Sequence, residues 1–104
     1  MKNLLNDIPT TLPEELLDTL VRTEHVKIER IVSRGHTSPE TGWYDQDEIE
    51  FVLLIKGAAQ LEFANGHTKS MGPGDWLVIP AHRKHRVAWT EKNTETVWLA
   101  VHYP

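Results

Sequence analysis

Two stretches of the sequence carry side chains that could do chemistry together. The first contains Tyr44, Gln46 and Glu50 and runs into an apolar segment, and the second ends with His82 and His85. Tyr44 and Gln46 are two residues apart, so on a strand their side chains would share one face. Carboxylate and imidazole groups are ligands for divalent transition metals, and the same groups can hydrogen-bond a small polar molecule. The residues therefore predict either a metal site or a polar pocket.

Composition limits the class of protein. A chain of 104 residues is long enough for one domain with its own core and too short for two. Its net charge is −4 and its basic residues are scattered, so we expect no nucleic-acid partner. The absence of cysteine excludes disulfides, thiolate metal sites and a cysteine nucleophile. The polar start is unlike a signal peptide, and no apolar run has the length of a membrane span. We therefore expect a cytoplasmic protein with no membrane partner.

A short helix is predicted near the start of the chain. Residues 11–14 read Thr-Leu-Pro-Glu, the pattern of a capping box with proline in the first turn. The leucines and valine of residues 16–21 then recur at helical spacing. A helix this short needs a surface to pack on. Residues 1–25 are therefore expected to form a helical segment packed on a domain made of residues 26–104.

From residue 26 onward the patterns are those of strands. Residues 25–32 alternate between the two faces of a strand with one side buried. Asn65-Gly66 is a strong hairpin signal, because both turn positions need positive φ. Further strands are expected at residues 43–46, 50–56, 59–63, 67–70, 76–79, 86–89 and 96–102. Seven or eight short strands with regular turns predict an all-β fold, an antiparallel β-barrel or jelly roll.

The first of the two chemical stretches resembles a motif of the cupin family of small β-barrels. That motif is, in outline, H-x-H, three or four residues, E, six residues, G. Glu50 and Gly57 match its second half, and Tyr44 and Gln46 stand where the two histidines are expected. The second half of the motif is thus intact, whereas its histidine pair is replaced.

The second stretch resembles the other cupin motif, which is G, five residues, P-x-G, two residues, H. It matches at Gly74, Pro80 and His85, with His82 in place of the last glycine. The resemblance extends from about residue 32 to the end of the chain, with the Asn65-Gly66 hairpin between the motifs. It implies a cupin-like barrel, but not one activity, because cupins include dioxygenases, isomerases, decarboxylases, sugar-binding modules and storage proteins.

The resemblance also implies a ligand set. Intact cupin sites offer three imidazoles and a carboxylate, which suit divalent iron, manganese, nickel, copper or zinc. Here the resemblance places the metal on Gln46, Glu50 and His85. The expected pocket residues around it are Tyr44, His36, His82 and His102. Because a phenol and an amide are poorer donors than two imidazoles, we expect weaker metal binding than in a three-histidine cupin.

Two kinds of function remain open at this point. In one, a divalent ion polarises a small substrate or activates oxygen, as in a dioxygenase, isomerase or decarboxylase. In the other, the same residues bind a small molecule without metal, in a binding or sensing module that has no catalytic role. The sequence names neither the ligand nor the reaction.

A homodimer is also predicted. Residues 50–56 are apolar on both faces of the expected strand, whereas a strand with one face in water would alternate with polar residues. The expected helix could cover only part of such a sheet. A second copy of the chain is therefore expected to cover the rest.

Overall fold

The computed structural model describes residues 1–39 and 42–104, and that part of the chain contains eight strands. They are β1 (Leu16–Arg22), β2 (Lys27–Ser33), β3 (Ile49–Lys56), β4 (Ala59–Phe63), β5 (Thr68–Met71), β6 (Trp76–Ile79), β7 (His85–Thr90) and β8 (Thr96–Tyr103). Within these residues no helix is long and apolar enough to cross a membrane.

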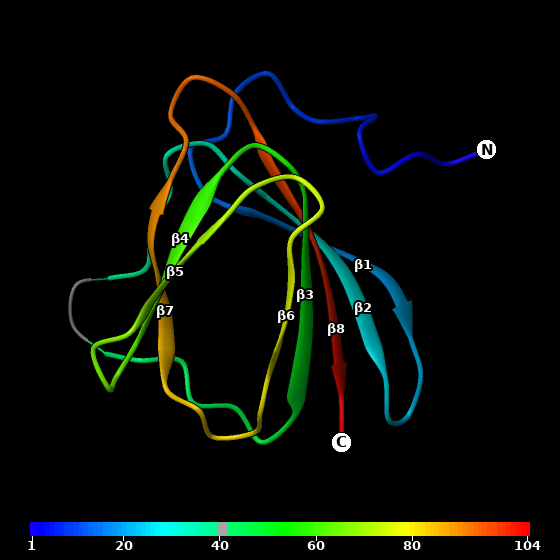
Figure 1. The fold of residues 1–104 in the computed structure, drawn as a ribbon. Coiled ribbons are helices and arrows are strands. Elements are labelled where there is room, and N and C mark those ends of the chain that lie inside the picture. Colours follow the sequence, from blue (N-terminus) through cyan, green and yellow to red (C-terminus); the bar gives the residue numbers. More distant parts are fainter. Residues whose placement is uncertain (40–41) are drawn as a thin grey trace.

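The strands form two antiparallel sheets that face each other (Figure 1). One sheet has five strands in the order β1-β2-β8-β3-β6, and the other has three in the order β5-β4-β7. The last strand of the chain, β8, thus lies at the centre of the larger sheet, between β2 and β3. The all-β, antiparallel barrel predicted from the sequence is confirmed.

The predicted N-terminal helix is wrong. Residues 16–22 form strand β1, which pairs antiparallel with β2 from Leu16 opposite Val32 to Arg22 opposite Lys27. A helix of this length is marginal in water, whereas β2 offers a free row of backbone hydrogen-bonding groups. Two β-branched residues, Thr19 and Val21, also suit a strand. The tertiary pairing therefore overrides the helical spacing of the leucines.

The other predicted strands agree with the structure to within two residues at each end, with one exception. Residues 43–46 do not form a strand, and only Tyr44 makes a single bridge, to His85. The Asn65-Gly66 turn joins β4 to β5, and the Gly66 N–H donates to the Phe63 carbonyl (2.9 Å).

The core lies between the two sheets. Leu54, Leu61, Phe63 and Trp98 are each at most 3% exposed and belong to one apolar cluster. Polar side chains replace this cluster at one end of the barrel, where β8 ends and β3 and β7 begin (lower end in Figure 1). That end holds the candidate site.

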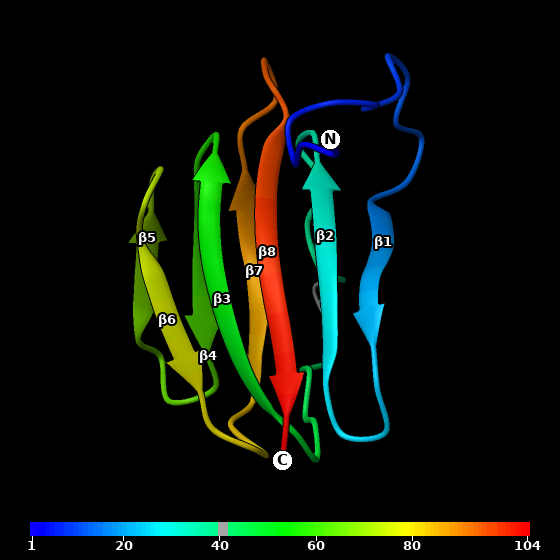
Figure 2. The same ribbon diagram turned by 90° about the vertical axis from the view of Figure 1, so that its right-hand side faces the viewer.

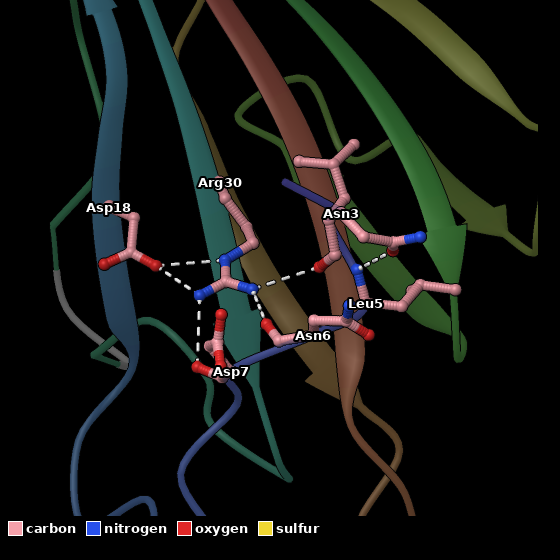
Figure 3. Close-up of polar contacts among 7 residues, drawn as sticks. Asn3, Leu5, Asn6, Asp7, Asp18 and Arg30 are labelled. Carbon is pink, nitrogen blue, oxygen red and sulfur yellow. Dashed lines mark hydrogen bonds and ion pairs between the residues drawn. The ribbon is translucent and has the colours of Figure 1, made fainter. Parts of the chain in front are cut away.

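The segment before β1 crosses the outer face of the larger sheet, over β2 and β8 (Figure 2). Arg30 fastens it there (Figure 3). Its guanidinium donates to the backbone carbonyls of Leu4 (3.1 Å) and Asn6 (2.6 Å), and it forms an ion pair with Asp18 on β1. Arg30 is 8% exposed, so these partners satisfy a charge that water hardly reaches.

Candidate functional site

A cavity of about 160 Å³ lies between the two sheets at the polar end of the barrel. Its polar lining residues are Glu15, Glu29, Gln46, Glu50, His85 and His102. The remaining lining is mostly apolar and includes Trp98 and Val52. Tyr44 and Leu17 also line the cavity, and both are exposed to solvent. The volume is close to the ~150 Å³ of an engineered protein cavity that binds benzene. The enclosed part therefore suits a small ligand.

Glu50 and His85 form the first polar pair in this cavity. The inward face of β3 carries Glu50, Val52 and Leu54, so strand alternation brings a carboxylate to the edge of the core. His85, the first residue of β7, presents Nε2 to Glu50 Oε1 at 3.6 Å. This separation is too long for a hydrogen bond. Both residues are less than a tenth exposed.

The other nitrogen of His85 fixes the tautomer. Nδ1 lies 2.8 Å from the Arg83 carbonyl oxygen, which can only accept, so Nδ1 carries a proton. The lone pair of a neutral His85 is then on Nε2, directed towards the Glu50 carboxylate. Two acceptor atoms that face each other need a cation between them, either a proton on Nε2 or a metal ion. A backbone carbonyl on the remote nitrogen is also what orients most metal-ligating histidines.

The pKa of His85 is raised above its ordinary value of 6.5. Burial opposes this shift because it disfavours the charged imidazolium. The Glu50 carboxylate and the Arg83 carbonyl together outweigh burial by stabilising the protonated ring. In the absence of a metal, the position between Glu50 and His85 therefore favours a proton.

Backbone pairing between the loops before β3 and β7 brings the two sequence motifs together. Tyr44 and His85 exchange backbone hydrogen bonds (2.8 and 3.2 Å), and the His82 N–H donates to the Gln46 carbonyl (2.7 Å). The Tyr44 ring is tilted against the His85 ring, with centroids 5.7 Å apart, and is 47% exposed. Tyr44 therefore lies at the mouth of the cavity, and Gln46 lines it.

Glu29 and His102 form a second polar pair, on the inward face of strands β2 and β8. His102 Nε2 lies 2.9 Å from Glu29 Oε1, and the residues are 7% and 9% exposed. Pairing of β2 with β8 places Glu29 opposite Ala100, so its side chain shares the inward face with His102. Pairing of β8 with β3 places His102 opposite Glu50. One cavity thus contains two imidazole–carboxylate pairs.

Five of the seven residues named from the sequence line the cavity. They are Tyr44, Gln46, Glu50, His85 and His102.

His36 and His82 do not line it. His36 accepts the backbone N–H of Arg34 through Nδ1 (2.8 Å) and lines a separate hollow beside Tyr44. The side chain of His82 is 63% exposed and lies between Asp45 (2.8 Å) and Asp47 (3.4 Å).

Sequence reasoning missed Glu15 and Glu29 in the cavity. The sequence does indicate Glu29, because this charged residue shares a strand face with Ile31, where an unpaired carboxylate would be costly. Glu15 gave no such signal, because it lies in the region expected to be helical. The Trp98 indole N–H has no hydrogen-bond partner in the described part of the chain, and no sequence pattern predicts that.

The residues fit a divalent metal ion through two strong ligands. Nε2 of His85 and the carboxylate of Glu50 face each other, and the Gln46 amide oxygen belongs to the same cavity. Within residues 1–39 and 42–104, no group of three or more histidine, cysteine, aspartate or glutamate residues is placed to hold a metal. A metal bound here would therefore take weak donors, water or a ligand to complete its coordination.

Comparison with known proteins places the chain in a family. The sequence model described as a cupin domain matches residues 31–102. The chain belongs to the cupin family, as its two motifs and its barrel indicate. No curated protein sequence matches it.

Solved structures give the same result. One similar structure is a candidate mannose-6-phosphate isomerase from Ralstonia eutropha JMP134, with 44% identity, a TM-score of 0.95, and coverage of 99% of this chain and 96% of that one. A cupin superfamily protein from Desulfitobacterium hafniense DCB-2 is 20% identical, with a TM-score of 0.75 over 92% of this chain and 83% of that one. An RmlC-like cupin with a double-stranded β-helix fold from Methanocaldococcus jannaschii is 21% identical, with a TM-score of 0.72 and coverages of 94% and 87%. The last two share the fold alone.

Proposed function

We propose that this cupin binds a small, uncharged polar molecule in the cavity between its sheets, together with a divalent metal ion on Glu50 and His85. The observation that carries the proposal is the pair itself. His85 Nε2 and Glu50 Oε1 are 3.6 Å apart, Nδ1 is committed to a backbone carbonyl, and both side chains line the cavity.

In this proposal Glu50 and His85 hold the ion and Gln46 supplies a weaker oxygen ligand. The bound ion would act as a Lewis acid that polarises an oxygen of the ligand. The Arg83 carbonyl keeps the His85 ring oriented, and the apolar walls exclude water. Tyr44, at the mouth, contacts a ligand as it enters.

The charge of the lining supports an uncharged ligand. Among the described residues, three glutamates and two histidines line the cavity, with no lysine or arginine. A phosphate or carboxylate placed there would face three carboxylates, whose combined charge exceeds that of one divalent ion on Glu50 and His85. The Ralstonia protein is a candidate isomerase of a phosphorylated sugar. We infer an isomerase-type chemistry for this chain as well, on a substrate that lacks the phosphate.

A second candidate function is a metal-free binding module. The raised pKa of His85 favours it, because a protonated His85 already satisfies Glu50. The ligand would then be held by hydrogen bonds alone, and Glu50 would not need a metal.

A metal titration separates these two candidates. The chain, purified without an affinity tag, is melted with iron, manganese, nickel, copper or zinc at neutral pH. If the metal proposal holds, at least one ion raises Tm, and Glu50→Gln and His85→Ala both abolish the rise while remaining folded. His25→Ala is the matched control, because His25 is an exposed histidine paired with Glu24. A wild-type protein whose Tm no metal changes would refute the metal proposal and leave the binding module.

The charge of the ligand is tested with a matched pair of probes. Calorimetry with mannose and with mannose 6-phosphate compares the same ring with and without the anion. We expect any measurable binding to favour mannose. Tighter binding of mannose 6-phosphate would overturn the uncharged-ligand proposal.

A further inference from the structure

The Glu29–His102 pair has no part in the binding described so far. Its hydrogen bond is short and buried (2.9 Å), and both residues line the cavity that contains Glu50 and His85. The pair comes from β2 and β8, whereas the other pair comes from β3 and β7. Two imidazole–carboxylate pairs, carried by different strands, therefore line the same small cavity.

The hydrogen bond to Glu29 determines which nitrogen of His102 carries a proton. An ionised carboxylate accepts hydrogen bonds and cannot donate one, so Nε2 is the protonated nitrogen of a neutral His102. The lone pair is then on Nδ1. Among the hydrogen bonds of the described residues, His102 takes part through Nε2 alone, and none joins its Nδ1. A carboxylate that holds an imidazole in one tautomer, with the other nitrogen unpaired, is the arrangement by which a histidine serves as a base.

Stability does not account for this pair. Replacing a buried ion pair or charged hydrogen bond by apolar residues of similar volume is often neutral or stabilising. The neighbours on the same strand faces, Ile31 and Trp98, show that these positions otherwise carry apolar side chains. A polar pair placed at the cavity wall therefore points to a role towards the ligand.

We propose that His102 is the base of this cavity and that Glu29 is its positioning residue. The proposal rests on the isomerase-type function proposed above and names its substrate class, small uncharged hydroxycarbonyl compounds. His102 Nδ1 takes the proton from the carbon next to the carbonyl group. The C–H electron pair moves into an enediolate, whose oxygen is stabilised at the Glu50–His85 pair. The proton of the neighbouring hydroxyl group passes to the former carbonyl oxygen, and return of the proton from His102 to the former carbonyl carbon completes an isomerisation with no oxidant or reductant.

Deuterium exchange tests the step without identifying the natural substrate. Dihydroxyacetone is a neutral hydroxyketone small enough for the cavity, and in D₂O its carbon-bound protons exchange only if a base removes them. Exchange is followed by proton NMR with wild type, His102→Asn and Glu29→Gln. We expect about a 100-fold or greater loss of catalysed exchange in His102→Asn, since positioned bases contribute about 10²–10⁴-fold. His25→Asn, at the exposed pair, should exchange like wild type.

The positioning role of Glu29 has its own readout. In long-range proton–nitrogen NMR of histidine-labelled wild type, the neutral His102 ring should be protonated on Nε2, and Glu29→Gln should change that ratio. Glu29→Gln should also lower kcat for exchange while KM changes little, whereas a purely structural role would lower Tm and leave the tautomer unchanged. Thermal unfolding of both variants shows whether they are folded.

The outcomes distinguish the two proposals. If wild type binds dihydroxyacetone but does not accelerate its exchange, His102 is not a base and the binding function stands. If exchange is fast and His102→Asn retains it, the base lies elsewhere and the inference is refuted. If wild type neither binds nor exchanges the probe, while mannose also fails to bind, the proposed function itself fails.

Discussion

Among the glycines, Gly57 is the one where an added methyl group meets the closest atoms. It follows β3 with φ +91°, a region that side-chain-bearing residues adopt at a cost of about 1–3 kcal/mol. A Cβ built on Gly57 would also lie 2.7 Å from the Thr96 Cα and 2.8 Å from the Glu95 carbonyl oxygen. Backbone atoms cannot move aside as a flexible side chain can, which adds about 1–3 kcal/mol of overpacking. Gly57→Ala should therefore destabilise the fold by about 2–6 kcal/mol.

Gly66→Ala separates the two contributions. Gly66 has nearly the same φ, +90°, but a Cβ there would meet nothing within 4 Å. It should cost only the backbone strain, about 1–3 kcal/mol. Urea unfolding of both variants measures the difference, for which we expect about 2 kcal/mol, equivalent to roughly 10 °C in Tm for a domain of this size. Equal losses of stability would show that the approach of β8 to Gly57 is not a constraint, and would refute the steric argument.

Three further predictions concern the site, the N-terminal segment and assembly. Because the folded pKa of His85 is raised, its contribution to stability should be complete below pH 6.5 and lost as pH rises through the folded pKa. Glu50→Gln should reduce this pH dependence in urea unfolding, and an unchanged profile would show that Glu50 does not stabilise the protonated His85. Arg30→Met should cost about 1–3 kcal/mol and speed amide exchange in residues 3–8, seen by mass spectrometry, whereas unchanged exchange would mean that other contacts hold the segment. We also expect a homodimer through the outer face of the five-stranded sheet, where Trp76 is 63% exposed. Light scattering should show a monomer for Trp76→Glu and a dimer for the control Trp89→Glu, which lies on the other sheet. A monomeric wild type would refute the dimer.

Much of the fold follows from local rules that the sequence displays directly. The hairpin at Gly66 needs positive φ, and strand alternation places Glu50 on the same face as the core residue Leu54. The N-terminal strand could not be predicted in the same way. Its leucines fit a helical stripe, and only the pairing with β2, the next strand along the chain, selects a strand.

The sequence predicts the site residues that stand at motif positions, but not those that only the order of the strands brings to the cavity. Glu50 and His85 stand at motif positions and meet in the structure. Glu29 joins them only because β8 lies between β2 and β3, an order that no local pattern encodes. His82 shows the reverse, since its motif position suggests the cavity while its backbone, at φ +62°, directs it to two exposed aspartates.

The central place of β8 also has a consequence for how the protein is made. On the ribosome, β1, β2, β3 and β6 are all synthesised before β8, yet in the larger sheet β2 and β3 make no ladder with each other and are joined only through it. The sheet therefore remains in two pieces until residues 96–103 have left the exit tunnel. During that interval both halves would expose unpaired strand edges and apolar faces. Emergence of β8, and not of any earlier strand, is therefore the event that closes the barrel and creates the cavity.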